Sequence, residues 1–276
     1  MLHQKGKVII VGAGPGDPEL LTVKAARWLQ RADVVLTDRL VSEELLREFV
    51  RPGADIIPVG KQARKGASTP QSDINRLLVF HAVQGRLVVR LKGGDVSIFS
   101  NVLDELLTLV DHQIPYEIVP GVTSALGAAA YAGIPLTARG HASAVRFLTL
   151  HQPETFSDSY WKELAATDDT LVFYMSGAHL PLIQQRLRTH EISTDKKIAL
   201  VEQATTPCQR VTIASVYEDK AWPAETASPA LLIIGRVVDL HERFAWLANA
   251  PINENHFQPV AARLYPWEEK EQLQTA

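Results

Sequence analysis

The sequence predicts an α/β fold made of two domains. Short apolar runs rich in β-branched residues, each as long as one buried strand, alternate with longer helical stretches over residues 1–136. Such alternation is typical of a parallel sheet covered by helices on both faces. The pattern then restarts but ends with strands that have little helix between them, which indicates a mixed sheet. The 276 residues, 46% of them hydrophobic, are enough for about two domains.

The first domain, residues 1–136, is expected to contain five strands joined by helices. Asp17 and Pro18 suit the start of the first helix, as N-cap and first helical residue, and the Ser42 hydroxyl can cap the second. A long polar loop precedes the third helix, and a helix of small residues closes the domain. The predicted strands cover 7–11, 33–38, 54–60, 86–91 and 116–121.

The second domain, residues 137–250, follows the linker "IPLTARGH". It is expected to contain a helix around Trp161 and another that begins near His179. Its predicted strands cover 144–151, 169–175, 197–204, 209–216 and 229–238. The remaining residues, 251–276, are polar and are expected to form a loosely attached tail.

Composition and charge exclude several classes of protein. The net charge of −3 gives no basic field for nucleic acid. The single cysteine, Cys208, excludes internal disulfides and fits a reducing compartment. We find no secretory signal, no apolar stretch long enough for a membrane and no zinc-type histidine spacing. We therefore expect a cytoplasmic protein without a metal, a nucleic-acid partner or a membrane partner.

The loop "GAGPGD", residues 12–17, is similar to a dinucleotide-binding loop but differs at key positions. Gly12 and Gly14 match that fingerprint, whereas Asp17 stands where the third glycine belongs. A carboxylate there would oppose a pyrophosphate, and Pro15 removes one backbone N–H that would bind it. The loop can therefore approach a ligand closely, but a phosphate is not the expected ligand. A tight turn without any ligand is the alternative.

A second glycine break, Gly93-Gly94-Asp95, follows the strand "RLVVRL". In open parallel sheets, ligands bind beyond the carboxyl ends of the strands, so both glycine breaks could line one crevice. A buried carboxylate beside bare backbone suits a cation or hydroxyl groups. S-adenosylmethionine, with its sulfonium, ammonium and ribose, has the required chemistry.

The ordered motifs of the chain resemble those of the tetrapyrrole (corrin/porphyrin) methylase family, in the branch that methylates uroporphyrinogen III. The matching motifs span roughly residues 7–248 and include "VGAGPGDPELLT", "DRLVS", "VVRLKGGD", "VPGVTSALGAAAYAGIPLTARG" and "VEQATTPCQRV". The resemblance implies two α/β domains with the active-site cleft between them, and a homodimer. It implies S-adenosylmethionine as methyl donor, S-adenosylhomocysteine as product, and methylation of uroporphyrinogen III at C2 and C7 to precorrin-2, for sirohaem or cobalamin.

The resemblance also implies which residues contact the cofactor. Met175 has ordinary core packing as its alternative role, and Ala204 stands where relatives often have glycine. The implied cofactor contacts are Pro15, Gly93, Gly94, Asp95, Ile98, Thr123, Ser124, Met175 and Ala204.

By the same resemblance, Asp38 is the proton acceptor and Lys61 the proton donor of the reaction. The alternative for Asp38 is a structural role in a turn or as a helix cap. The alternative for Lys61 is that it is a solvated cation in a loop. Arg39 and Arg139 are the expected partners of substrate carboxylates. The substrate carries eight carboxylates, and charge-assisted pairs with arginines would fix its orientation. Arg64 and Lys65 lie in the same loop as Lys61 and are further candidates for pairing with substrate carboxylates. For these two residues, an exposed charged loop without that role is nearly as good an interpretation.

Two loops depart from the family pattern. Relatives generally continue "RLKGGD" with Pro-Phe-Ile-Phe-Gly-Arg-Gly-Gly-Glu-Glu, of which Ile98, Phe99 and Glu105 remain here. The loop 62–69 is one residue longer than usual. These changes leave two alternatives open: a methyltransferase of the same fold for a later corrin precursor, or a weakly catalytic protein that binds S-adenosylmethionine or a tetrapyrrole. No dehydrogenase–chelatase module is present in the sequence, so a separate downstream partner is expected.

Overall fold

A computed structural model of the chain describes residues 5–60, 69–150, 155–219, 222–223, 226–251 and 255–258. Its contacts divide the chain into two compact units. Of the described residues, unit 1 holds those within 5–14, 18–121 and 257–258, and unit 2 holds those within Pro15–Asp17 and Val122–His256. The predicted boundary at residue 136 differs from this division, in which Val122 already belongs to unit 2. Most of the predicted tail, 251–276, lies outside the described residues.

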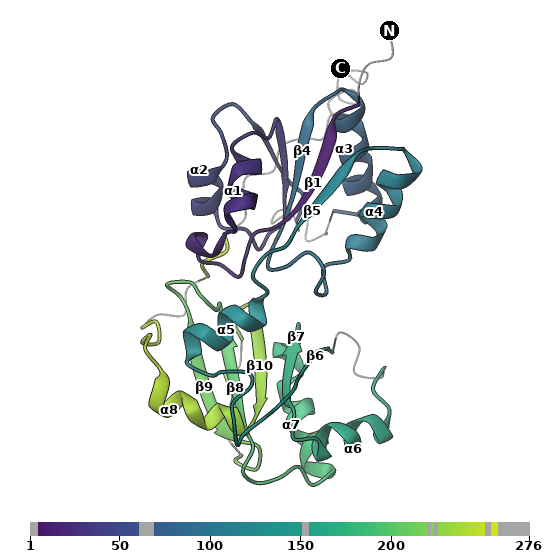
Figure 1. Cartoon of the computed structure of the whole chain (residues 1–276). Helices are drawn as coiled ribbons and strands as arrows, with labels where there is room; N and C mark the ends of the chain where they lie inside the picture. Colours follow the sequence, from purple (N-terminus) through teal and green to yellow (C-terminus); the bar gives the residue numbers. More distant parts are fainter. Residues whose placement is uncertain are drawn as a thin grey trace, which may run out of the picture. The chain divides into compact units, whose positions relative to one another are not determined.

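Unit 1 is built on a sheet of five parallel strands, as the sequence predicts, in the order β3-β2-β4-β1-β5. Helices α1 and α2 cover one face, and α3 and α4 cover the other (Figure 1). The elements are β1 (Lys7–Gly12), α1 (Val23–Leu29), β2 (Val34–Thr37), α2 (Glu43–Phe49), β3 (Asp55–Pro58), α3 (Gln71–Val83), β4 (Leu87–Lys92), α4 (Val102–Asp111) and β5 (Tyr116–Val119).

The first helix begins later than the sequence predicts. Pro18–Leu20 forms only a short 3-10 turn, and α1 begins at Val23 with Thr22 as its cap, whose hydroxyl accepts a hydrogen bond from the Ala25 N–H at 3.2 Å. Asp17 is therefore not the N-cap. Its carboxylate instead accepts a hydrogen bond from the Tyr131 hydroxyl at 2.5 Å, which holds it in unit 2. The predicted cap of α2 is confirmed, because the Ser42 hydroxyl accepts from the Leu45 N–H at 3.2 Å.

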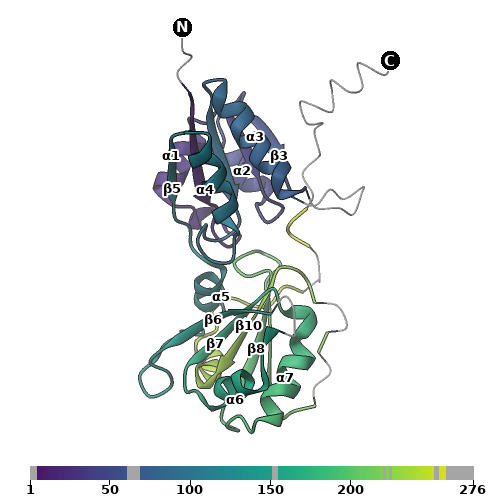
Figure 2. The same cartoon turned by 90° about the vertical axis from the view of Figure 1, so that its right-hand side faces the viewer.

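Unit 2 is built on a mixed sheet in the order β6-β7-β10-β8-β9, as predicted. Only β6 and β7 run parallel; the other neighbours are antiparallel. Helices α6 and α7 pack on one face around Trp161 and Phe173, and α5 packs on β10 (Figure 2). The elements are α5 (Ser124–Ala132), β6 (Val145–Thr149), α6 (Asp158–Ala166), β7 (Thr170–Tyr174), η3 (Gly177–His179), α7 (Leu180–Thr189), β8 (Lys197–Glu202), β9 (Arg210–Ser215), β10 (Ala230–Gly235), η4 (Arg236–Leu240) and α8 (His241–Phe244).

Helix α5 is connected to unit 2 by its packing on β10 and by hydrogen bonds at both of its ends. Its terminal carbonyls accept hydrogen bonds from side chains far along the sequence. The Trp246 indole donates to the Ala130 carbonyl at 2.9 Å, and His241 Nδ1 lies 2.6 Å from the carbonyl oxygen of Ala132. These partners explain why unit 2 begins before residue 136.

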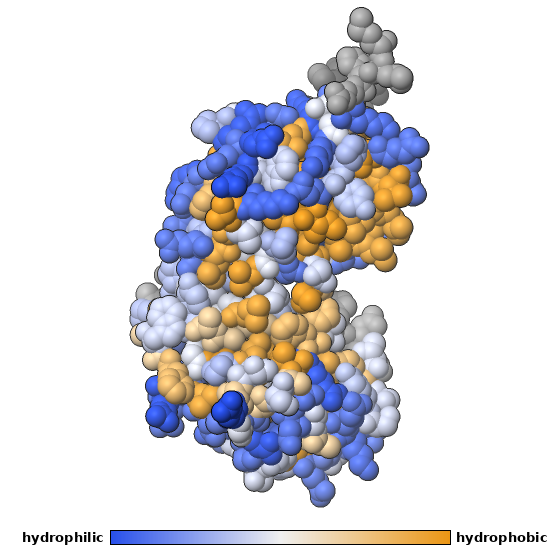
Figure 3. Space-filling view, viewed as in Figure 1, coloured by the Kyte–Doolittle hydropathy of each residue, from blue (hydrophilic) through white to orange (hydrophobic). Residues whose placement is uncertain are grey.

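The surface of unit 1 is apolar over α4. Figure 3 shows apolar surface on this side of unit 1. Leu103, Leu107 and Val110 of α4 are each more than half exposed, and their spacing puts them on one face of that helix. Among the described residues, no helix has the length and hydrophobicity needed to cross a membrane.

Candidate cofactor and catalytic site

The two glycine breaks of unit 1 pack directly against each other at the carboxyl edge of the parallel sheet. The Gly14 N–H donates to the Gly94 carbonyl at 3.1 Å, and the Gly94 N–H donates to the Gly14 carbonyl at 2.7 Å. A Cβ on Gly12 would lie 2.6 Å from the Gly94 oxygen, and one on Gly121 only 2.3 Å from it. The glycines therefore allow backbone to meet backbone, in addition to any ligand that approaches this edge.

Asp95 ties these loops together as an ionised carboxylate. It is 8% exposed; Oδ1 accepts hydrogen bonds from the Ser97 N–H at 2.8 Å and the Ser97 hydroxyl at 2.5 Å, and Oδ2 accepts from the Gly121 N–H at 2.9 Å. Burial acts to raise the pKa of Asp95, but these hydrogen bonds outweigh it and the pKa is lowered. Gly93 and Ile98, both half-buried, lie on either side of this anchor.

Asp38 lies at the same edge, directly after β2, and is held by an ion pair. Its Oδ1 accepts a hydrogen bond from Arg90 Nη2 at 2.5 Å, and its side chain remains 31% exposed. Arg90 Nε donates to Glu105 Oε1 at 2.9 Å, and Lys92 Nζ donates to the same oxygen at 3.0 Å. Arg90, Lys92 and Glu105 are each at most 3% exposed. Asp38 does not cap the following helix, because Ser42 is the N-cap of α2.

The sequence interpretation missed this buried network. In the sequence, Arg90 and Lys92 are two cations in an otherwise apolar run. Strand alternation places both on the face of Val88, which belongs to the core under α3 and α4. Charged residues at buried positions of a strand need a partner, and that rule was the available signal. The identity of the partner, Glu105, required the position of α4.

In unit 2, several predicted cofactor residues gather around the amino terminus of α5. The Thr123 hydroxyl and the Tyr174 hydroxyl lie 2.7 Å apart, and the Ala125 N–H donates to the Tyr174 hydroxyl at 3.2 Å. Ser124, half-buried, is the first residue of that helix. Pro15 packs on Gly127, where an added Cβ would come within 2.6 Å of the proline ring.

Met175 and Ala204 stand at the ends of β7 and β8, in strained backbone. Met175 has a φ of +53° and is 55% exposed, so core packing does not explain it. Ala204 is buried between Gln203, with a φ of +46°, and Thr205, with a φ of +66°. A positive φ costs conformational free energy at residues other than glycine, and residues with such backbone strain are found preferentially at functional sites. The Tyr174 contact to Thr123 brings Met175 close to the start of α5.

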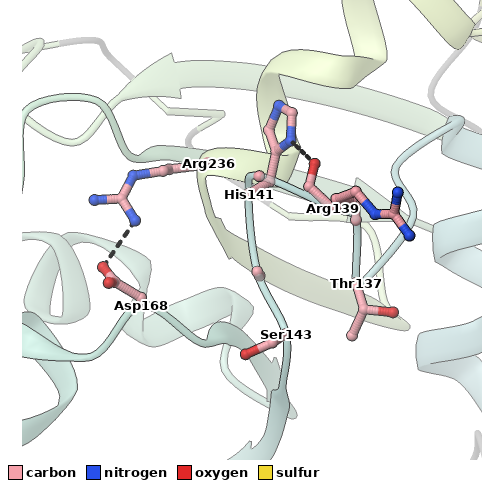
Figure 4. A pocket seen from close by; sticks show the side chains of 9 residues that line it. Thr137, Arg139, His141, Ser143, Asp168 and Arg236 are labelled. Carbon is pink, nitrogen blue, oxygen red and sulfur yellow. Dashed lines mark hydrogen bonds and ion pairs between the residues drawn. The ribbon is translucent and has the colours of Figure 1, made fainter.

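Arg139, in contrast, does not lie with these residues. It belongs to the loop that precedes β6, whereas Met175 follows β7. Because β6 and β7 are parallel neighbours, the two residues lie at opposite ends of these strands. Figure 4 shows Arg139 beside an open pocket of about 690 Å³ in which Arg236 pairs with Asp168 at 2.7 Å and His141 lies against the Arg139 carbonyl. Arg39 follows Asp38 and packs its backbone against Gly60. Lys61, Arg64 and Lys65 lie outside the described residues.

This fold and this arrangement of loops define a family. The sequence model of the tetrapyrrole (corrin/porphyrin) methylases matches residues 7–218, and the chain belongs to that family. Among individual proteins, the siroheme synthase of Stutzerimonas stutzeri (strain A1501) is 49% identical over 247 residues, which are 89% of this chain and 53% of that protein. The chain therefore spans about half the length of the curated relatives it matches.

Solved structures of smaller relatives match over their whole length. The crystal structure of uroporphyrin-III-C-methyltransferase from Thermus thermophilus is 36% identical, with a TM-score of 0.73, and the match covers 89% of this chain and 99% of that one. A structure of the Thermus thermophilus enzyme complexed with S-adenyl homocysteine is 38% identical, with a TM-score of 0.69, and the match covers 85% and 100% of the two chains.

Proposed function

We propose that this chain is a uroporphyrinogen-III C-methyltransferase that uses S-adenosylmethionine. It would methylate its substrate at C2 and C7 and release precorrin-2, in the pathway to sirohaem or cobalamin. The observation that carries the proposal is the ion-paired carboxylate of Asp38 at the same sheet edge as the two interlocked glycine loops. The names of the relatives, siroheme synthase and uroporphyrin-III-C-methyltransferase, support the same reaction.

The residues present fit the cofactor that the family implies. In unit 1, Gly93, Gly94 and Asp95 offer bare backbone and a carboxylate for hydroxyl and ammonium groups, and Ile98 offers an apolar contact. In unit 2, exposed Met175 offers a soft thioether, and the start of α5 at Thr123 and Ser124 offers backbone N–H groups. Pro15 and Ala204 complete the proposed contacts.

The chemistry requires alignment and the net loss of one proton from the substrate for each methyl group added. The bound cofactor supplies a methyl group on a sulfonium, whose bonding electron pair stays on sulfur while a pyrrole carbon donates the pair for the new carbon–carbon bond. The positive charge then leaves the substrate as a proton. We assign its acceptance to Asp38 Oδ2, since Arg90 holds Oδ1. We assign to Lys61 the donation of a proton to the tetrapyrrole, which a second departing proton balances.

Recognition of the substrate carboxylates is assigned to Arg39 and Arg139. Arg39 is adjacent to Asp38, which supports the first assignment. The second assignment rests on the resemblance alone, because Arg139 lies at the opposite end of the strands from Met175 and the neighbouring Arg236 is already paired with Asp168 and Asp195. We further propose a cytoplasmic homodimer whose product is taken up by a dehydrogenase–chelatase activity.

The Asp38→Asn variant tests the proposal. Wild-type protein should transfer labelled methyl groups from S-adenosylmethionine to uroporphyrinogen III, and the variant should do so on the order of 100-fold more slowly, because an amide cannot accept the proton. Binding of S-adenosylhomocysteine, measured by calorimetry, should change little.

The matched control is Asp33→Asn. Asp33 also flanks β2 and pairs with an arginine, Arg51 Nη2 at 2.7 Å, but at the opposite end of the strand. Its turnover should stay close to that of the wild type. Equal turnover in Asp38→Asn and wild type would remove Asp38 from the base role, and no transfer by the wild type would overturn the proposed function.

A further inference from the structure

Four charged side chains of unit 1 form one continuous network on the face of the sheet under α3 and α4. The chain of contacts runs Asp38–Arg90–Glu105–Lys92, with distances of 2.5, 2.9 and 3.0 Å. Alternation along β2 and β4 places Asp38 on the face of Leu36, and Arg90 and Lys92 on the face of Val88. Glu105, from the first turn of α4, enters the same layer and is fully buried.

The network is poorly explained by stability. Burying charges removes their hydration, and such clusters can often be replaced by apolar residues without loss of stability. Glu105 Oε2 has no hydrogen-bond partner within the described part of the chain, although it is fully buried. Burial, and then the charge of Arg90, lower the pKa of Lys92, which is a further cost of this arrangement. A role in orienting a reactive group accounts for a cluster that stability does not favour.

Only one end of the network reaches the surface. Arg90, Lys92 and Glu105 are at most 3% exposed, whereas the Asp38 side chain is 31% exposed. The guanidinium is fixed from three sides, since Nε donates to Glu105 and Nη1 donates to the carbonyl of Leu91 at 3.2 Å and approaches that of Leu36 at 3.5 Å. The remaining nitrogen, Nη2, donates one of its two hydrogens to Asp38 Oδ1.

We propose that Arg90 is a positioning residue for Asp38, and that Glu105 and Lys92 fix Arg90 in turn. The guanidinium holds Oδ1 and thereby presents Oδ2 to the proton that leaves the substrate. This inference rests on the proposed function of Asp38. A lysine cannot replace the arginine, because one ammonium on a flexible stem cannot satisfy Glu105, Asp38 and two carbonyls in a fixed fork.

The test is Arg90→Lys in two backgrounds, wild type and Asp38→Asn. In the wild-type background, kcat for methyl transfer should fall roughly 10- to 100-fold, while the KM for S-adenosylmethionine stays within about threefold. In the Asp38→Asn background, the same change should alter kcat by less than about twofold, because the residue it positions is already disabled. A structural role would lower kcat equally in both backgrounds, which would overturn the proposal.

The matched control is Arg51→Lys, which alters another arginine paired with an aspartate next to β2. Its kcat should remain within about twofold of the wild type. If Arg90→Lys does not fold, Glu105→Gln serves instead: it keeps the ion pair with Asp38 and removes the charge behind Arg90, and it should show the same dependence on background.

A crystal structure of Arg90→Lys separates this proposal from the proposed function, because it needs no activity. The Asp38 carboxylate should leave its wild-type position while β2 and β4 stay in place. An Asp38 carboxylate that does not move would overturn the positioning role. Absence of methyl transfer in the wild type would instead contradict the proposed function and leave this measurement valid.

Discussion

Single glycines decide how closely the two loops of unit 1 can approach. Gly12 is buried at the end of β1, and its α-carbon faces the backbone of Gly94 and Gly121. Gly53, in contrast, has a φ of +82° but no atom within 4 Å of the position of a Cβ. The two sites therefore separate the steric cost of a side chain from the cost of an unfavourable φ.

Gly12→Ala should lower the free energy of unfolding by about 3 kcal/mol and abolish S-adenosylhomocysteine binding, because its Cβ would lie 2.6 Å from backbone atoms of two other segments. The control Gly53→Ala should cost only about 1 kcal/mol and leave binding intact. Urea denaturation and calorimetry measure both. Similar losses in the two variants would show that the glycine contacts do not hold the loops together.

Some features near the candidate site could be predicted residue by residue, for reasons that are local. Gly94 and Asp95 follow a recognisable strand, and the Ser42 cap depends on residues three positions apart. Thr22 was missed in favour of Asp17, because both residue types suit a cap, and the choice depended on a distant partner, Tyr131. Lys61 stays a prediction.

Among the elements, the edge strand β5 pairs with β1 and is further linked to its neighbours by the carboxylate of Glu117. Glu117 of β5 lies 2.7 Å from Lys7 Nζ of β1 and 2.6 Å from Lys24 Nζ of α1, and it accepts a hydrogen bond from the Trp28 indole at 3.3 Å. The lysine hydrogen bonds, first Lys24 and then Lys7, lower the pKa of Glu117 from 4.5 to about 2. The strand is thus connected to both the sheet and the covering helix.

Glu117→Gln should destabilise unit 1 in a pH-dependent manner. Since the pKa in the folded state lies below that in the unfolded state, the stabilisation by Glu117 is complete above about pH 4.5 and is lost as the pH falls toward 2. The difference in unfolding free energy between wild type and variant should therefore shrink over that range. Urea denaturation at several pH values measures it, with exposed Glu48→Gln as control; a difference that is constant with pH would contradict the assignment.

The order of elements could be predicted more fully than their membership in the two units. Alternating strands and helices indicated the parallel sheet, because the period of the pattern is a local property. The assignment of α5 to unit 2 depends on contacts with β10 and on partners such as Trp246 and His241, more than 100 residues away along the chain. Only tertiary contacts contain that information.

At the scale of the whole molecule, the chain spans about half the length of its curated relatives but nearly the full length of the Thermus thermophilus methyltransferase. The match to that smaller protein includes both units. The loops at 62–69 and 96–104 are the segments that the sequence predicts to depart from the family pattern.

The most direct test of the account is the mass of the product formed from uroporphyrinogen III and S-adenosylmethionine under anaerobic conditions. We predict a product with two added methyl groups, together with two equivalents of S-adenosylhomocysteine. S-adenosylhomocysteine binding measured in parallel verifies that the protein is competent. Binding without any methyl transfer to uroporphyrinogen III would contradict the account.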